Sequence, residues 1–322
     1  MKRRQFITLL GGAAAAWPVA ARAQQAAMPV IGFLRSTAAD GFAHLVTSFR
    51  QGLNEAGFIE GRNVAIEYRW ADNQHDRLPA LAADLVRRQV SVIVANAISA
   101  HAAKAATATV PIIFVAGFDP VDAGLVASLN RPGGNVTGVV FNTIGLTAKR
   151  LGLLHELVAK IAVVAVMLDP NLPGSEIELR DAVEAGHTIG LQILIVSAAD
   201  EHEINAAFAQ VVEAGAGALL VGSGPVFLSQ RRQLVALAAR HALPASYVTR
   251  QYPEAGGLMS YGPSQTDAYR RAGTTSPGFS RAPHPPTCRS NCPLLSIWSS
   301  TSRPPRRSGL KCRRRCSPAP TR

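Results

Sequence analysis

The chain has 322 residues, of which 48% are hydrophobic, and its formal net charge is +12. Of its 33 Lys and Arg residues, four lie in residues 1–23 and ten in residues 274–322, where Asp and Glu are absent. The stretch between them, residues 24–273, therefore holds 19 basic and 21 acidic residues, so the overall charge does not indicate a nucleic-acid partner for it.

Residues 1–23 have the order of a bacterial secretory signal. A basic start is followed by a short apolar run and by a small-x-small cleavage site at residues 21–23. The apolar run is too short for a stable membrane anchor. Because Arg3 and Arg4 stand next to each other, we expect a twin-arginine signal, with an ordinary secretory signal as the alternative. The mature protein is expected in the periplasm after cleavage behind Ala23.

Residues 24–273 alternate between short apolar runs and amphipathic segments. Strands are expected at 30–34, 63–68, 90–95, 112–115 and 136–141, and then at 162–168, 192–196, 218–221 and 245–248. The helical segments between the later strands are 146–158, 175–189, 201–213 and 228–241. Short apolar strands spaced by helices indicate parallel sheets that are covered on both faces.

Two such series of similar length predict an α/β protein of two Rossmann-like lobes. Lobe one is expected to comprise residues 29–140 with 260–273, and lobe two residues 141–259. Glycine-rich crossings near 138–143 and 255–262 would form a hinge between the lobes.

Several segments together resemble one family of bacterial proteins. They are 30–34 (VIGFL), 49–57 (FRQGLNEAG), 61–64 (GRNV), 119–121 (DPV), 129–138 (LNRPGGNVTG) and 257–262 (GLMSYG). The sequence is similar to ABC-transporter substrate-binding proteins, which include binders of tryptophan and other aromatic amino acids. The resemblance implies a type I periplasmic-binding-protein fold and a monomeric, non-enzymatic receptor. It also implies a small-molecule ligand and an inner-membrane ABC permease as partners, without a cofactor, a metal or a nucleic acid.

The ligand is expected beyond the carboxyl ends of the strands, where two facing lobes form one cleft. The ligand-binding residues predicted there are Ser36, Asn96, Ser99 and Asp119, then Phe141, Asn171, Phe227 and Tyr247, and finally Ser260 and Tyr261 at the return crossing. The strand ends also carry Arg35, Asn142, Asp169 and Gly224. Hydroxyls, amides and carboxylates suit an amino acid, and rings suit an apolar or aromatic side chain.

Each of these positions also has a purely structural explanation. Asp119 and Asn171 stand beside prolines and could serve only as turn residues. Phe141 and Phe227 could belong to the hydrophobic core. Asn96 could satisfy loose backbone groups at the end of its strand. The ligand class comes from the family resemblance, because composition does not select it.

Signatures of catalysis are largely missing from the sequence. It contains no His-Glu-x-x-His, no Gly-x-Ser-x-Gly and no Gly-Lys-Ser motif, and no cysteine precedes residue 288. A periplasmic α/β enzyme using the same cleft remains the alternative from another functional class. The effector domain of a sugar-type repressor would need a DNA-binding helix pair in place of an export signal.

Residues 274–322 differ in composition from everything before them. They hold all four cysteines and nine of the 21 prolines, and they show almost no apolar periodicity. The cysteines could form a zinc site or two disulfides, and the arginines a nucleic-acid arm. We favour a disordered tail that is translated out of frame, which would leave lobe one incomplete. A non-functional relative of a binding protein is then a further alternative.

Overall fold

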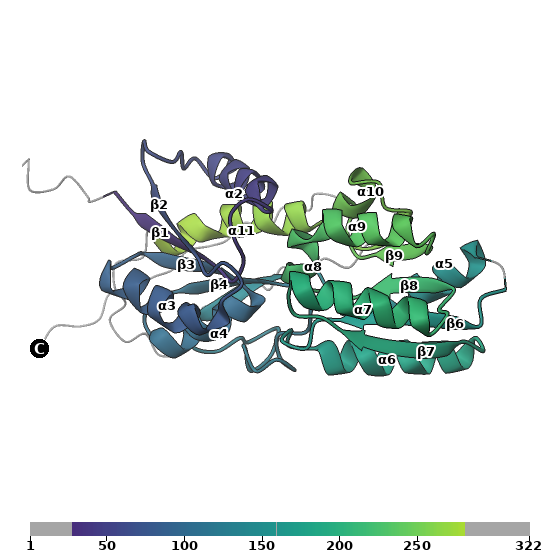
Figure 1. Cartoon of the computed structure of the whole chain (residues 1–322). Coiled ribbons are helices and arrows are strands. Elements are labelled where there is room, and N and C mark those ends of the chain that lie inside the picture. Colours follow the sequence, from purple (N-terminus) through teal and green to yellow (C-terminus); the bar gives the residue numbers. More distant parts are fainter. Residues whose placement is uncertain (1–27, 159, 281–322) are drawn as a thin grey trace, which may run out of the picture.

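The computed structural model describes residues 28–158 and 160–280, which form two α/β lobes side by side (Figure 1). The predicted signal peptide at 1–23 lies outside the described residues. The same holds for the predicted tail from residue 281 onward, including its four cysteines. In the described part of the chain, no helix is both long and apolar enough to cross a lipid bilayer.

The sheet of lobe one has the strand order β2-β1-β3-β4-β5, and all neighbouring strands are parallel. Its strands are β1 (Val30–Arg35), β2 (Ala65–Trp70), β3 (Val92–Asn96), β4 (Ile112–Ala116) and β5 (Val136–Val140). Strands β3 and β4 consist almost entirely of buried apolar residues, so both faces of the sheet need cover. Helices α2 (Ala43–Glu55) and α11 (Gln265–Ser280) cover one face, and α3 (Leu78–Arg87) and α4 (Ala97–Ala106) cover the other.

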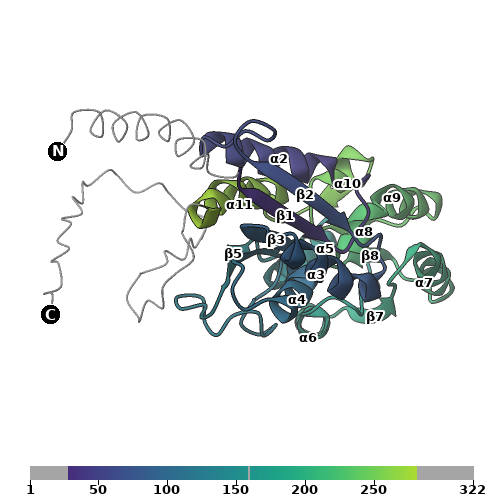
Figure 2. The ribbon, with the colours of Figure 1, turned by 90° about the vertical axis from the view of Figure 1, so that its left-hand side faces the viewer.

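Helices α2 and α11 are far apart in sequence but lie side by side (Figures 1 and 2). Glycines permit this close approach. A Cβ atom at Gly52 would collide with the carbonyl oxygen of Arg270, and one at Gly273 would collide with that of Phe49. The boundary expected after Gly273 thus falls inside α11, which the contact with α2 holds in place and which runs on to Ser280.

The sheet of lobe two has the order β10-β9-β8-β6-β7, again with parallel neighbours. Its strands are β6 (Val163–Leu168), β7 (Gln192–Ser197), β8 (Ala218–Val221), β9 (Ala245–Tyr247) and β10 (Met259–Ser260). Helices α5 (Thr147–Leu157) and α6 (Ser175–Thr188) pack on one face. Helices α7 (Glu201–Glu213), α8 (Pro225–Ser229) and α9 (Arg231–Arg240) pack on the other face, and the short α10 (Gln251–Glu254) precedes β10.

The chain passes between the lobes twice. It leaves the first sheet after β5 through the short 3-10 helix η2 (Ile144–Leu146), and it returns from β10 into α11. A second 3-10 helix, η1 (His75–Arg77), precedes α3. The helix predicted at 228–241 is in fact two helices, α8 and α9, that meet at Gln230. Pro225, which is favoured in the first helical turn, starts the shorter one earlier than expected.

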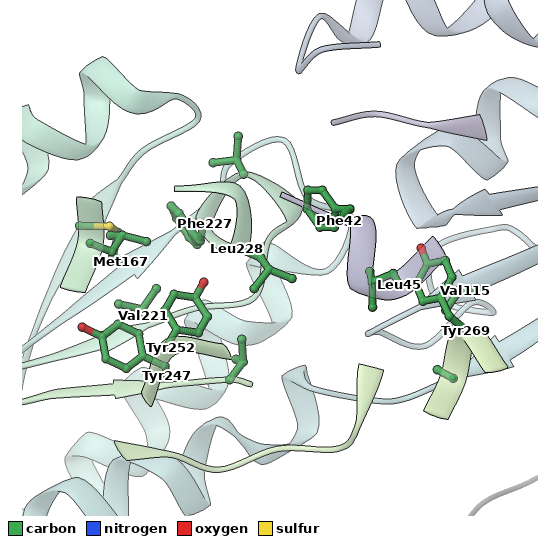
Figure 3. Close-up of a cluster of buried hydrophobic side chains, with 14 of the residues drawn as sticks. Phe42, Leu45, Val115, Met167, Val221, Phe227, Leu228, Tyr247, Tyr252 and Tyr269 are labelled. Atoms are coloured by element: carbon green, nitrogen blue, oxygen red, sulfur yellow. The ribbon is translucent and has the colours of Figure 1, made fainter. Parts of the chain in front are cut away.

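One hydrophobic cluster continues from lobe one into lobe two. Phe42 and Tyr269 contribute from lobe one, and Phe227 and Leu228 contribute from lobe two (Figure 3). The loop before α2 also touches α8, because Gly41 lies against Ser229. The lobes are therefore packed against each other at one edge of the space between them.

Candidate functional site

A cavity of about 60 Å³ lies between the two lobes, at the carboxyl ends of their strands. Lobe one and the crossings line it with Arg35, Asn96, Ala97, Ile98, Val115, Gly117, Phe118, Phe141, Thr143, Gln265 and Tyr269. Lobe two lines it with Leu172, Ser223, Gly224, Pro225, Leu228, Val248 and Thr249. The location follows from the parallel topology, which brings the loops after β1, β3, β4, β6, β8 and β9 to one region.

Arg35, at the end of β1, is a buried cation without an acidic partner. Its side chain is 2% exposed, and its guanidinium carbon lies 4.1 Å from the ring centroid of Phe42 and 5.3 Å from that of Tyr269. Nη1 donates to the hydroxyl of Tyr269, and Nε donates to Oγ1 of Thr37 at 3.4 Å. Among the ion pairs of residues 28–158 and 160–280, none includes Arg35. Burial lowers the pKa of Arg35, and the hydroxyl of Tyr269 partly offsets this shift.

Three of the predicted residues form a hydrogen-bonded group, and one of them, Ser36, follows Arg35 in the sequence. The amide of Asn96 donates to Oγ of Ser36 at 2.9 Å, and the Ser36 backbone N–H donates back to Oδ1 of Asn96 at 3.1 Å. Ser99 donates to the same Oδ1 at 2.6 Å. Asn96 lines the cavity, whereas Ser36 and Ser99 are buried behind it and hold its side chain in one orientation.

A chain of hydrogen bonds leads from lobe one through the crossing into lobe two. Thr143 donates through Oγ1 to the carbonyl of Gly117 at 3.0 Å and accepts from Oγ of Ser223 at 2.8 Å. The backbone N–H of Ser223 donates to the buried carboxylate of Glu178 at 3.0 Å. Arg150 lies 3.7 Å from that carboxylate. The cavity wall is thus connected to the interior of lobe two.

Two neutral oxygen atoms in the cavity wall have no hydrogen-bond partner. Within the described residues, Oγ1 of Thr249 and Oε1 of Gln265 are both buried and unpartnered. They come from the loop after β9 and from the first turn of α11. Unsatisfied buried acceptors are costly, so a bound molecule with hydrogen-bond donors would stabilise them.

The rest of the lining is mostly apolar. Phe141, one of the predicted ligand-binding residues, lines the cavity, and Leu172, Leu228 and Val248 lie on the side of lobe two. A concave site with apolar walls and a few converging polar groups is typical of small-molecule binding. In the described part of the chain, no group of three or more His, Cys, Asp or Glu side chains is placed to hold a metal ion. The arrangement suits a small organic anion with an apolar body.

The other predicted residues lie outside the cavity lining. Asp119 and Asn171 are exposed: the carboxylate of Asp119 accepts from the N–H of Val121 at 2.8 Å, and Asn171 donates its N–H to Asp169. Both positions therefore act in turns. Phe227 and Tyr247 are fully buried in the core. Tyr247 stacks on Tyr252, with ring centroids 4.5 Å apart.

Ser260 ends the edge strand β10 and Tyr261 follows it, and neither lines the cavity. Tyr261 is 43% exposed. Arg35, which the sequence placed at a strand end facing the cleft, lines the cavity. The polar lining residues that the prediction left out are Thr143, Ser223, Thr249, Gln265 and Tyr269. Arg35 had a usable signal, because a charged residue ends an otherwise apolar strand. Tyr269 had none, because it reaches the cavity only through the packing of α11 against lobe one.

A family model described as ABC transporter substrate binding protein matches residues 30–275. The chain belongs to this family. The family resemblance seen in the sequence is thereby confirmed. A curated relative of this substrate-binding protein is the tyrosine-binding protein of Clostridioides difficile (strain R20291), which is 30% identical over 165 residues. That match covers 51% of this chain and 47% of the relative, so it spans about half of the relative's length.

Solved structures with similar folds include two close in shape to this substrate-binding protein. A conserved domain protein of Vibrio cholerae superposes with a TM-score of 0.74 at 19% identity, covering 80% of this chain and 86% of that one. The ABC domain of Streptococcus pneumoniae in complex with L-Trp gives 0.71 at 20% identity, with the same coverage. These likenesses confirm the predicted fold of two Rossmann-like lobes, each with a parallel sheet.

Proposed function

We propose that this protein is the solute-binding component of an ABC importer and that it closes its two lobes on a small carboxylate, an amino acid or a similar molecule. Arg35 is the observation that carries the proposal. It lines the interlobe cavity, it is almost fully buried, and it pairs with no carboxylate of the described residues. A buried charge is costly unless it is paired, so a ligand carboxylate would supply the missing partner.

The surroundings of Arg35 support recognition of a carboxylate. The rings of Phe42 and Tyr269 lie against the guanidinium and stabilise its positive charge. Unlike an acidic side chain, they do not compete with a ligand carboxylate for Arg35. A planar guanidinium can bind a carboxylate through two parallel hydrogen bonds. Asn96, which Ser36 and Ser99 hold in place, offers a further polar contact from the same lobe.

The two-lobed architecture supports binding by closure. The cavity is lined from both lobes, and within the described residues the backbone passes between them after β5 and after β10. A ligand that contacts both walls stabilises the closed arrangement relative to the open one. The closed shape is then what a membrane partner would recognise. We infer that an ABC permease is this partner and that the protein acts in the periplasm.

The relatives support the ligand class. One curated relative is a tyrosine-binding protein, and one structural neighbour was solved with L-Trp. Both ligands carry a carboxylate and an aromatic ring. Binding in place of catalysis is likewise in keeping with the family to which the chain belongs.

Thermal unfolding with a panel of small molecules tests the proposal. A ligand present at 100 times its Kd stabilises the folded state by about 2.7 kcal/mol, which raises the Tm of the protein by several degrees. We expect this shift with at least one amino acid or small carboxylate and none with the corresponding neutral amide. The absence of any shift across a panel that includes aliphatic and aromatic carboxylates would contradict the proposal.

A further inference from the structure

We propose that the preferred ligand of the interlobe cavity is a carboxylate without an α-ammonium group, such as a 2-hydroxycarboxylic acid, and not the corresponding amino acid. The inference rests on the proposed function, since it narrows the ligand class of the same cavity. It follows from the charges and the free acceptors that the cavity wall presents.

The cavity wall carries one charge. Among the lining residues, all of which belong to the described part of the chain, Arg35 is the only charged side chain, and none of the others is an Asp or Glu. A ligand with a single negative charge brings the sum of cavity and ligand to zero. A zwitterionic amino acid brings a second buried cation, and the sum stays positive. Burying an ammonium group without a counter-ion is unfavourable.

Three polar oxygens of lobe one and the crossing after β5 are already occupied. Oδ1 of Asn96 accepts from both Ser36 and Ser99, and Oγ1 of Thr143 accepts from Ser223. The carbonyl of Gly117 accepts from the N–H and the hydroxyl of Thr143. An ammonium with three N–H donors therefore finds few free acceptors on this side.

The two free acceptors are neutral, and they come from lobe two and from the return crossing. They are Oγ1 of Thr249 and Oε1 of Gln265, both buried and unpartnered within the described residues. A hydroxyl has one hydrogen to donate and carries no charge, so it can satisfy such an acceptor without adding a cation to the cavity. A carboxylate with a neighbouring hydroxyl fits this combination: the carboxylate would pair with the guanidinium, and the hydroxyl would donate to Oε1 of Gln265 and accept from the hydroxyl of Thr249.

The buried carboxylate of Asp169, next to the cavity, forms a hydrogen bond within its own turn. Asp169 lies beside Gly224 in lobe two but does not line the cavity. Its Oδ1 accepts from the N–H of Asn171 at 3.0 Å and shapes the turn after β6. Asp119 is exposed and holds a turn of its own.

Matched ligand pairs measure the effect directly on the full chain. The first pair is L-leucine and 2-hydroxy-4-methylpentanoate, and the second is L-phenylalanine and 3-phenyllactate. The members of a pair share one skeleton and differ only in ammonium against hydroxyl. By isothermal titration calorimetry at pH 7.5, we expect the hydroxy acid of at least one pair to bind tenfold or more tightly than its amino acid.

The possible results separate this inference from the proposed function. Amino acids that bind as tightly as the hydroxy acids, or more tightly, would overturn the inference while the proposed carboxylate site stands. If none of the four compounds binds and a wider carboxylate panel also fails, the proposed function is overturned together with the inference.

A variant that places an acid in the cavity sharpens the test. Gln265→Glu changes an amide to a carboxylate of nearly the same shape in the cavity wall. We expect the affinity ratio of hydroxy acid to amino acid to fall at least tenfold. Gln210→Glu, at an exposed position of α7, serves as the matched control and should leave the ratio unchanged. An unaltered ratio in Gln265→Glu, with intact circular dichroism, would contradict the role assigned to the cavity charge.

Discussion

Arg35 in lobe one and Arg150 in lobe two are both buried arginines, but their surroundings differ. Arg150 is 0% exposed and lies 3.7 Å from the carboxylate of Glu178. Its Nη2 also donates to the carbonyls of Val221 and Ser246, the latter at 3.0 Å. Arg35 is 2% exposed and meets two aromatic rings and two hydroxyls, with no acid of the described residues as its partner.

The difference assigns the two side chains to different tasks. Arg150 comes from α5 and ties together β8, β9 and α6 inside lobe two. Arg35 ends β1 and lines the cavity. A buried arginine that is paired within its own lobe maintains the fold, whereas one that is unpaired and faces a cavity is available to a ligand. The following experiments test this difference between the two arginines.

Glu178→Gln should produce the largest effect on stability. It leaves Arg150 buried without a counter-charge, and breaking a buried ion pair in this way typically costs about 3–5 kcal/mol. Chemical denaturation should show a loss of this size in the free energy of unfolding. Glu184→Gln, at an exposed position of the same helix, should change it by less than about 0.5 kcal/mol. Equal stability of the two variants would contradict the role of the pair.

Arg35→Met should show the opposite pattern. Removing the guanidinium eliminates a buried charge that has no acidic partner, so the free energy of unfolding should stay the same or rise slightly. The affinity for a carboxylate ligand should fall by about 2–5 kcal/mol, roughly 30-fold to several thousandfold. Calorimetry measures the affinity and denaturation measures the stability. Arg62→Met, on the exposed surface of lobe one, is the control that should retain both. A stable variant with unchanged affinity would remove Arg35 from the site.

Asp169→Asn should show that the charged carboxylate of Asp169 lowers the free energy of unfolding at high pH. Burial raises the pKa of Asp169 from its ordinary 3.8 to about 6. The folded state is therefore most favoured while the group is protonated, and this contribution is lost as the pH rises from about 4 through 6. At pH 8 the Asn variant, which keeps the acceptor for the N–H of Asn171, should be more stable by up to about 3 kcal/mol. At pH 3.5 the two proteins should be equally stable, and a difference that does not depend on pH would disprove the explanation.

Gly273→Ala should have a smaller effect, confined to lobe one. The added methyl group would strike the carbonyl oxygen of Phe49 and force α11 away from α2. We expect a loss of about 1–3 kcal/mol in the free energy of unfolding, and a weaker affinity because Tyr269 would move with α11. Gly278→Ala, in the same helix but with open space around the position, is the matched control. If both substitutions are tolerated equally, the close packing of the helices is not essential.

The sequence was sufficient to predict the fold because its signals are local. Continuous apolar strands such as β3 and β4 and the amphipathic helices between them predict parallel sheets, and the order of the series predicts two lobes. The helix that starts at Gln265 was missed, since its position depends on the close contact of Gly273 with α2 across the fold. Periodicity does not report such a contact.

The site was predictable only where position in the topology decides the role. Asn96 ends β3 and Phe141 follows β5, two strands whose carboxyl ends face the other lobe, and both residues line the cavity. Asp119 has the same topological position, but its carboxylate is used by the backbone of its own turn. Thr249 and Tyr269 became visible only once both lobes were placed. The signal peptide and the out-of-frame origin of the tail stay predictions, and the nucleotide sequence around codon 274 tests the latter.

The crystal structure of the protein with its tightest-binding carboxylate tests the central claim most directly. We predict that the carboxylate oxygens lie about 2.7–2.9 Å from the guanidinium nitrogens of Arg35, the distance of a charge-assisted hydrogen bond. The apolar part of the ligand should lie against Phe141 and Leu228 between the lobes. A ligand carboxylate bound elsewhere, with Arg35 paired to an acid of the protein itself, would contradict the account.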